Sequence, residues 1–179
     1  MKIADIKPLL YSGSNGTTLD LDWVKELLDK MEKDYGLDLD PEFQRGHVWS
    51  AETKTKFIEF VLRGGVVPPI RFNSPCFGGH PHSKKSDLPE TVVIVDGKQR
   101  LTACIEFIDN KIAVFGGHYL KDFDNPDLLL RKAHMTYIVN KLQTKSELYQ
   151  WYLEMNEGQI AHTQEELDKV RDLLAKEVS

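Results

Sequence analysis

The sequence predicts an α+β fold, a single domain in which a small mixed sheet is flanked by helices. The order of the chain predicts it first, because stretches with helical spacing of apolar residues alternate with short β-branched stretches. The length of 179 residues then corresponds to about one domain of roughly 150 residues. A composition of 41% hydrophobic and 28% charged residues suits one buried core. We therefore expect residues 1–179 to form one domain.

The first predicted elements are an N-terminal arm and a helix. Residues 1–15 are expected to form a lead-in strand or arm, followed by a turn over residues 12–16. A helix capped by Thr18 or Asp20 is predicted to run to about Tyr35, because its apolar residues follow helical spacing.

A second helix and a strand precede a long loop. Ser50 is placed to cap a helix that reaches Arg63. Residues 68–73 are predicted to form a strand that is entered through prolines. Residues 74–90 show no periodicity, and a loop of this length is usually functional or mobile, for example as a lid or a DNA-contacting finger.

The clearest strand covers residues 91–95. It is β-branched and continuously apolar, which predicts a central strand that is buried on both faces. It leads directly into the pair Asp96-Gly97 and then into a helix from about Gln99 to Asp109.

The remaining elements are two strands and the C-terminal helices. Strands are predicted at residues 112–115 and 135–139. Helices are predicted over residues 144–177, opened by capping boxes at Thr144 and Thr163.

The charge and cysteine content exclude several classes of protein. With 23 basic and 28 acidic residues the net charge is −5, so a few well-placed cations must hold any polyanion. The two cysteines, Cys76 and Cys104, exclude a disulfide framework and suit a reducing cytosol. No apolar run approaches the roughly 18 residues that span a bilayer, and residues 1–5 lack a secretory signal. We therefore expect a cytoplasmic protein with no membrane partner.

The turn between the clearest strand and the next helix predicts an anion site. Gly97 allows a tight turn, and the first N–H groups of the helix have no partners within the helix. Lys98 and Arg100 add positive charge there, and the guanidinium group can grip two phosphate oxygens. Asp96 could hold a divalent cation or accept a proton. The alternative is an ordinary turn in which Asp96 caps the helix and Arg100 pairs with a surface carboxylate.

A second polar segment covers residues 43–50. Gln44, Arg45 and His47 bring an amide, a guanidinium and an imidazole together, between the aromatic residues Phe43 and Trp49. Polar groups between aromatic anchors suit the floor of a pocket. In the alternative interpretation the aromatic residues fix a loop to the core and the arginine extends into solvent.

Other residues carry weaker signals. Cys76, His80 and His82 are close enough in the sequence to suggest zinc, or simply a mobile loop. His162 could face a site or lie on the surface before a helix, and Cys104 is expected to pack in the core.

The two polar segments together resemble a known family. Residues 43–49, Phe-Gln-Arg-Gly-His-Val-Trp, and residues 95–103, Val-Asp-Gly-Lys-Gln-Arg-Leu-Thr-Ala, are similar to motifs of the ParB/sulfiredoxin-like superfamily. Within it they most resemble the GmrS-like family of type IV, modification-dependent restriction enzymes and of small phage proteins. This resemblance implies a mixed sheet with a nucleotide or phosphate site at these motifs, and an association with nucleotide hydrolysis and DNA.

The resemblance also implies roles for matching residues. Arg45 and Arg100 would contact phosphates, Asp96 would serve a metal or the reaction, and Gln44 and Gln99 would orient groups. Lys98 stands where the family usually has glutamine. We therefore predict two sets of site residues: a catalytic set, Asp96, Arg100 and Gln99, with Asp96 also a metal ligand, and a phosphate- or nucleotide-binding set, Gln44, Arg45, His47, Gly97, Lys98 and Thr102.

The working hypothesis is an enzyme that uses Mg²⁺ and a nucleoside triphosphate and acts on DNA or nucleotides. Its reaction would be nucleotide hydrolysis, phosphoryl transfer or strand cleavage, since these need positioning and charge neutralisation more than a strong nucleophile. The alternative is a non-catalytic module that binds nucleotide or modified DNA in a phage or bacterial defence, counter-defence or DNA-modification system. Either protein would work in the bacterial cytoplasm, and an oligomer is compatible with the sequence.

Overall fold

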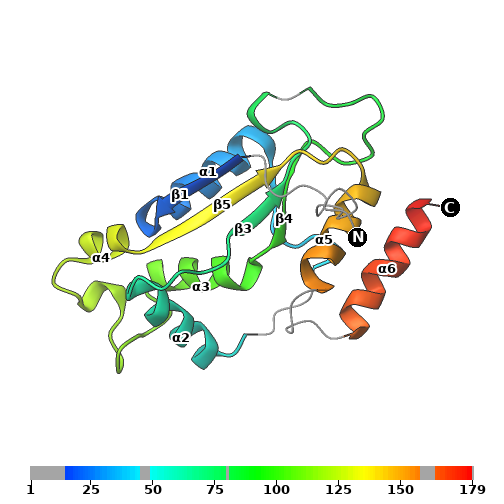
Figure 1. The fold of residues 1–179 in the computed structure, drawn as a ribbon. Coiled ribbons are helices and arrows are strands. Elements are labelled where there is room, and N and C mark those ends of the chain that lie inside the picture. Colours follow the sequence, from blue (N-terminus) through cyan, green and yellow to red (C-terminus); the bar gives the residue numbers. More distant parts are fainter. Residues whose placement is uncertain (1–14, 45–48, 80, 158–163, 179) are drawn as a thin grey trace, which may run out of the picture.

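The computed structural model describes residues 15–44, 49–79, 81–157 and 164–178. It confirms the α+β class, since helices surround one mixed sheet (Figure 1). None of the helices in these ranges is both long enough and apolar enough to cross a membrane. The elements, in chain order, are β1 Asn15–Asp20, the 3-10 turn η2 Leu21–Trp23, α1 Val24–Tyr35, β2 Leu37–Asp38, α2 Ala51–Leu62, β3 Ile70–Asn73, η3 Phe77–Gly79, β4 Val92–Asp96, α3 Lys98–Ile108, η4 Leu120–Asp122, α4 Pro126–Lys132, β5 His134–Asn140, α5 Lys145–Glu157 and α6 Gln164–Val178.

The sheet has the strand order β1-β5-β3-β4-β2. β5 pairs antiparallel with β1 and parallel with β3, while β4 pairs antiparallel with β3 and parallel with β2. Because β2 is only two residues long, most of the outer edge of β4 has no strand beside it among the described residues. The register between β3 and β4 places Arg71 opposite Asp96, with an irregularity between Arg71 and Phe72.

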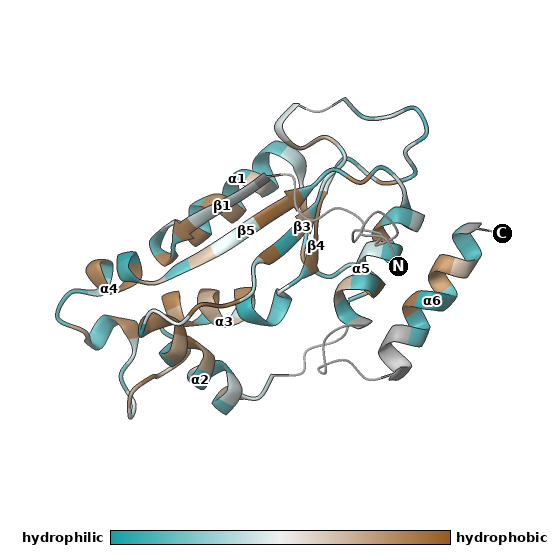
Figure 2. Ribbon diagram, viewed as in Figure 1, coloured by the Kyte–Doolittle hydropathy of each residue, from teal (hydrophilic) through white to brown (hydrophobic). Residues whose placement is uncertain are grey.

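β4 connects two hydrophobic clusters, one on each face of the sheet. Val92 and Ile94 belong to the larger cluster, which includes residues of α1, α2, α3 and α4. Val93 and Val95 belong to the smaller cluster, which α5 and α6 help to form. Figure 2 shows most of β4 as hydrophobic. The prediction of a strand buried on both faces is confirmed, because alternate side chains of a strand point to opposite faces.

Two other sequence predictions hold at the helix ends. Ser50 accepts a hydrogen bond from the backbone of Thr53 and caps α2. Thr144 and Glu147 form the predicted capping box, with bonds of 3.2 Å to the Glu147 amide and 3.1 Å to the Glu147 carboxylate. The box predicted at Thr163 and the arm before Asn15 lie outside the described residues.

One prediction was wrong and another holds only in part. Residues 112–115 form no strand beyond a single bridge between Val114 and His118, because Phe115 has a φ of 48° and leaves the extended path. Asp20 is the N-cap residue of η2, which leads into α1, but its side chain makes no cap bond. Thr18 belongs to β1, where its hydroxyl lies 2.9 Å from that of Thr136 on β5. Pairing with β5 therefore overrides the local capping signal.

The long loop after β3 is fixed at its base. The Gln143 amide donates to the Pro75 carbonyl oxygen at 3.1 Å and accepts from the Ser83 N–H at 3.0 Å. The Ser86 hydroxyl donates to the Gln143 carbonyl oxygen at 2.5 Å. These bonds fasten the loop to the β5–α5 connection, so the described part of the loop has a defined path.

Candidate functional site

The turn from β4 into α3 requires glycine at position 97. Gly97 has a φ of 97°, in the left-handed region that favours glycine. A Cβ atom there would lie 2.6 Å from Cδ1 and 3.2 Å from Cα of Ile70. The first helical bond joins the Leu101 N–H to the Gly97 carbonyl oxygen at 2.9 Å, so the N–H groups of residues 98–100 precede the helical ladder.

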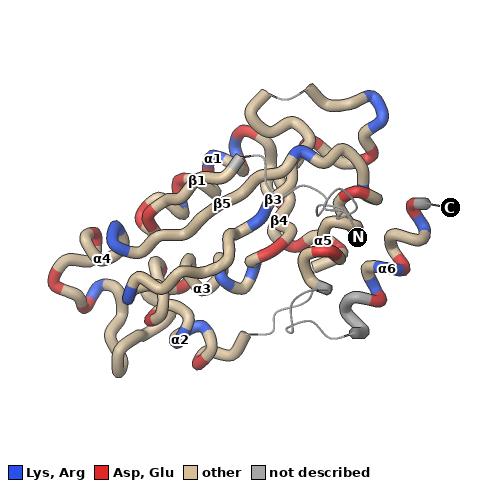
Figure 3. Tube along the Cα trace, viewed as in Figure 1, with Lys and Arg blue, Asp and Glu red and all other residues tan. Residues whose placement is uncertain are grey.

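The Asp96 carboxylate holds two arginine side chains. Its Oδ2 accepts from Nη1 of Arg71 at 3.1 Å and from Nη2 of Arg100 at 2.9 Å. Nη1 of Arg100 also donates to the Pro68 carbonyl oxygen. All three charged side chains are largely buried. The cluster carries a net charge of +1, and Figure 3 shows its acidic and basic residues where β4 meets α3.

This geometry excludes the interpretation of Asp96 as a simple cap. The N-cap residue of α3 is Gly97, and it has no side-chain cap bond. Arg71 was missed by the sequence analysis. The only sequence signal was a charged residue between Ile70 and Phe72 in an apolar strand. The alternation placed Arg71 on the opposite face from its neighbours, but it did not reveal Asp96 as its partner.

Lys98 is paired away from the turn. Its Nζ lies 2.5 Å from Oδ1 of Asp40, whose side chain is 82% exposed. Pairs with an exposed carboxylate typically contribute only about 0–1 kcal/mol. An anion at the turn can therefore recruit Lys98 at a small cost in stability.

Two glutamines differ in their hydrogen bonding: the side chain of one is bonded to β4, and that of the other has an oxygen that is unpaired within the described residues. The side-chain amide of Gln44 donates to the carbonyl oxygens of Val95 at 2.7 Å and Ile94 at 3.2 Å, along the open edge of β4. Gln99, the second residue of α3, is only 7% exposed, and its Oε1 is buried with no hydrogen-bond partner among the described residues. An unsatisfied buried acceptor costs about 1–3 kcal/mol, so this position favours a ligand that supplies a donor.

Of the other predicted site residues, only Thr102 lies within the described ranges. Thr102 lies one helical turn after Lys98, half-buried, and its hydroxyl bonds to no member of the Asp96 cluster within the described ranges. Arg45 and His47 lie outside the described residues, as does His162.

The described residues do not fit a Mg²⁺ ion held by the protein. No group of three His, Cys, Asp or Glu side chains in the described ranges could hold a metal. Asp96 already accepts from two guanidinium groups, so a divalent cation there would face two positive charges.

Within the described ranges, the zinc candidates Cys76 and His82 belong to no group of three His, Cys, Asp or Glu side chains that could hold a metal. Nε2 of His82 lies 3.0 Å from the Leu88 carbonyl oxygen, and His80 lies outside the described residues. Cys104 packs in the core as predicted, with Sγ 3.2 Å from Sδ of Met135. Burial raises the pKa of the Cys104 thiol to about 12.

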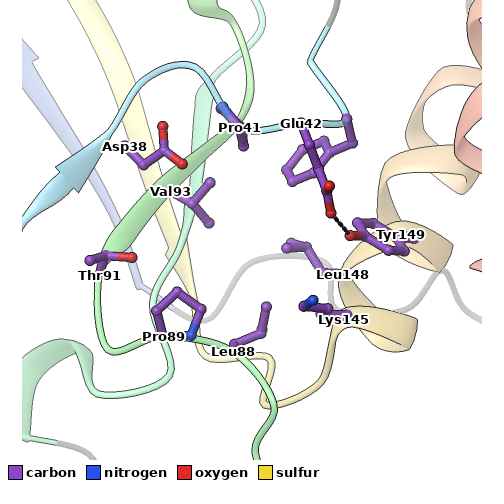
Figure 4. Close-up of a pocket in the computed structure, with 11 residues that line it drawn as sticks. Asp38, Pro41, Glu42, Leu88, Pro89, Thr91, Val93, Lys145, Leu148 and Tyr149 are labelled. Atoms are coloured by element: carbon purple, nitrogen blue, oxygen red, sulfur yellow. Dashed lines mark hydrogen bonds between the residues drawn. The ribbon is translucent and has the colours of Figure 1, made fainter. Parts of the chain in front are cut away.

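A pocket lies beside β4. It has a volume of about 290 Å³ and is lined by the segment after β2, by residues 88–93 and by the start of α5. Its polar residues include Asp38, Glu42 and Thr91 (Figure 4). The sequence analysis missed this pocket because its walls come from three distant segments of the chain.

One of the comparisons with known proteins supports the resemblance to the GmrS-like family. The family model described as GmrSD restriction endonuclease, N-terminal domain, matches residues 24–177. No curated protein and no solved structure matches the chain.

Proposed function

Because the chain belongs to the family of GmrSD restriction endonuclease N-terminal domains, we propose that it binds and hydrolyses a nucleoside triphosphate in support of an action on DNA. The β4–α3 turn is the phosphate site in this proposal. The buried Oε1 of Gln99, which has no hydrogen-bond partner among the described residues, carries the proposal. Gln99 belongs to the first turn of α3, where the N–H groups precede the helical ladder, and Arg100 of the Asp96 cluster follows it directly.

The phosphates would be held by charge and by backbone donors together. The N–H groups at the start of α3 face the phosphate oxygens, and Lys98 exchanges Asp40 for the ligand. Asp96 positions the guanidinium groups of Arg71 and Arg100 rather than contacting the ligand. Turning the Gln99 amide presents either its oxygen to a ligand hydroxyl or its NH₂ to a phosphate oxygen.

Hydrolysis at this site would rest on positioning and on charge neutralisation. The oxygen of water forms the new bond to the γ-phosphorus, the bond to the β–γ bridging oxygen breaks, and the products are a nucleoside diphosphate and inorganic phosphate. Arg71, Arg100 and Lys98 would stabilise the charge on the transferred group and on the leaving oxygens. Mg²⁺ would arrive on the phosphates of the nucleotide.

The Gln99→Leu variant tests the observation that carries the proposal. Leucine fills a similar volume without an unsatisfied acceptor, so we expect the free energy of unfolding to rise by about 1 kcal/mol. Nucleotide affinity is expected to fall by about tenfold or more, because the amide contact is lost. Urea unfolding and calorimetric titration with the four ribonucleoside triphosphates, with and without Mg²⁺, measure both. Gln150→Leu, at an exposed position of α5, is the control. Unchanged nucleotide affinity in Gln99→Leu would count against the proposal.

A second candidate, a non-catalytic nucleotide-binding module, is favoured by the pairing of Asp96. Oδ2 of Asp96 is already engaged by two arginines, so this carboxylate is placed to position them rather than to contact a reacting group. The Asp96→Asn variant separates the two functions when phosphate release is measured with and without DNA. The enzyme should lose turnover in this variant but keep nucleotide binding, since its arginines are no longer aligned for the transition state. A wild-type protein that binds nucleotide without releasing phosphate would support the module.

A further inference from the structure

The pocket beside β4 combines an apolar floor with hydrogen-bond acceptors at its rim. Val93 from β4, Leu148 from α5 and Leu88 supply the floor, and all three are buried. Figure 4 shows the side chains of Asp38, Val93 and Leu148 directed into the space. An apolar cavity with a few convergent polar groups is typical of a small-molecule site.

Asp38 and Glu42 are the two carboxylates at the rim, and one oxygen of each accepts a hydrogen bond from the protein. Oδ1 of Asp38 accepts from the Asp40 N–H at 2.8 Å, and Oε1 of Glu42 accepts from the Tyr149 hydroxyl at 2.5 Å. Across the described ranges, Oδ2 of Asp38 and Oε2 of Glu42 have no hydrogen-bond partner. Ionised carboxylates only accept hydrogen bonds, so a ligand must bring donors.

The charge of the pocket excludes a phosphate as its occupant. Asp38 and Glu42 face one cation, Lys145, whose Nζ lies 4.0 Å from Oε1 of Glu177. Burial, and then the bond to Glu42, raise the pKa of the Tyr149 phenol, which therefore stays a donor to Glu42. A flat, uncharged ring with N–H groups on its edge fits this combination of floor and rim.

Residues 40–44 connect the pocket with the turn between β4 and α3. Asp40 pairs with Lys98 of α3, and Gln44 bonds to the carbonyl oxygen of Val95. Pro41, Glu42 and Phe43, which lie between them in the chain, line the pocket. Along β4, Val93 precedes Asp96 by three residues, which corresponds to about 10 Å. A ribose with its first phosphates bridges such a distance.

We propose that this pocket binds the base of the nucleotide and selects guanine. Guanine presents two adjacent N–H donors on one edge, which match the free carboxylate oxygens. Uracil places carbonyl oxygens beside its single N–H, and these oxygens would face the carboxylates. Adenine and cytosine each pair one amino group with an acceptor and should bind with intermediate affinity. This inference rests on the proposed nucleotide function.

Calorimetric titrations of the full chain with GTP, UTP, guanosine and inorganic tripolyphosphate test the inference. We expect GTP to bind about tenfold or more tightly than UTP, because the N–H groups of guanine pair with the rim carboxylates, whereas the carbonyl oxygens of uracil would face them. Tripolyphosphate has no base and reports the phosphate turn alone.

The Asp38→Asn variant reverses the hydrogen-bonding pattern of the rim. Asparagine keeps an oxygen for the Asp40 N–H and replaces the free oxygen with an NH₂ donor. We expect the preference for GTP over UTP to fall by about tenfold, with xanthosine triphosphate binding improved and tripolyphosphate binding unchanged. Asp29→Asn, at an exposed position of α1, should change none of the three affinities.

The outcomes separate this inference from the proposed function. Equal affinities for GTP and UTP, with no effect of Asp38→Asn, would overturn the base pocket and leave the phosphate site standing. If tripolyphosphate fails to bind but guanosine binds in an Asp38-dependent manner, the pocket stands and the phosphate site fails. If neither guanosine nor GTP binds, both are overturned.

Discussion

The turn between β4 and α3, which we propose binds phosphates, and the pocket beside β4, which we propose binds the base, differ in how their charged groups are paired. At the turn each charge already has a protein partner: Asp96 holds Arg71 and Arg100, and Lys98 holds Asp40. At the pocket Asp38 and Glu42 each keep a free carboxylate oxygen within the described part of the chain. Under the two proposals, the turn would supply affinity for any polyphosphate through its positioned cations, and the pocket would discriminate among bases through its free acceptors.

Of the variants considered, Gly97→Ala is expected to have the largest effect on stability. A side chain at this position meets Ile70 and must adopt a φ of 97°, so we expect unfolding to become easier by about 2–4 kcal/mol. Urea denaturation measures this change. Gly78→Ala is the matched control, because Gly78 also has a positive φ but a Cβ there meets no atom within 4 Å. Equal losses in the two variants would show that backbone strain alone, and not the close approach to Ile70, requires glycine at position 97.

Alanine variants of the two arginines are expected to have an intermediate effect on stability. Arg100→Ala removes a bond to Asp96 and one to the Pro68 carbonyl oxygen, whereas Arg71→Ala removes only a bond to Asp96. We expect losses of stability of about 2 and about 1 kcal/mol, respectively. Tripolyphosphate affinity should fall in both variants, while the ratio of GTP to UTP affinity stays constant. A changed ratio would mean that the turn also selects the base.

Tyr149→Phe, a change in the pocket, is expected to have the smallest effect on stability. Burial, and then the Glu42 bond, raise the pKa of this phenol above its ordinary value of 10.0. An unfolded chain releases the proton near pH 10, whereas the folded chain retains it, so this group contributes stability below pH 10 that is lost as the pH rises. At pH 11 the wild-type protein should have lost about 1 kcal/mol more than Tyr149→Phe, relative to pH 8. Parallel pH profiles from urea unfolding would contradict the role of the buried phenol.

The sequence predicts the parts of the site that are local. Gly97 and the start of α3 follow from a buried strand that runs into a glycine and a helix, and both are found there. The partner of Asp96 on β3 could not be predicted, because it depends on the strand register and on the irregularity beside Arg71. The pocket depends on where residues 38–43, 88–93 and 145–149 meet, which no periodicity encodes. Arg45 and His47 stay predictions.

Helix boundaries also differ according to whether a local or a distant contact determines them. The capping box at Thr144 is a contact between residues three apart, and it forms as its sequence indicates. Thr18 has the same capping chemistry but forms a cross-strand contact with Thr136, 118 positions away. A local signal therefore decides the structure only where no distant strand competes for the same backbone.

The sharing of β4 between the two hydrophobic clusters affects how the protein can be shortened. Val93 and Val95 are covered by the cluster that includes α5 and α6. A chain cut before Lys145 would present these valines to water on a strand whose outer edge pairs only with the two residues of β2. Exposed apolar edges of this kind recruit other chains, so we expect such a fragment to aggregate rather than to persist as a smaller domain.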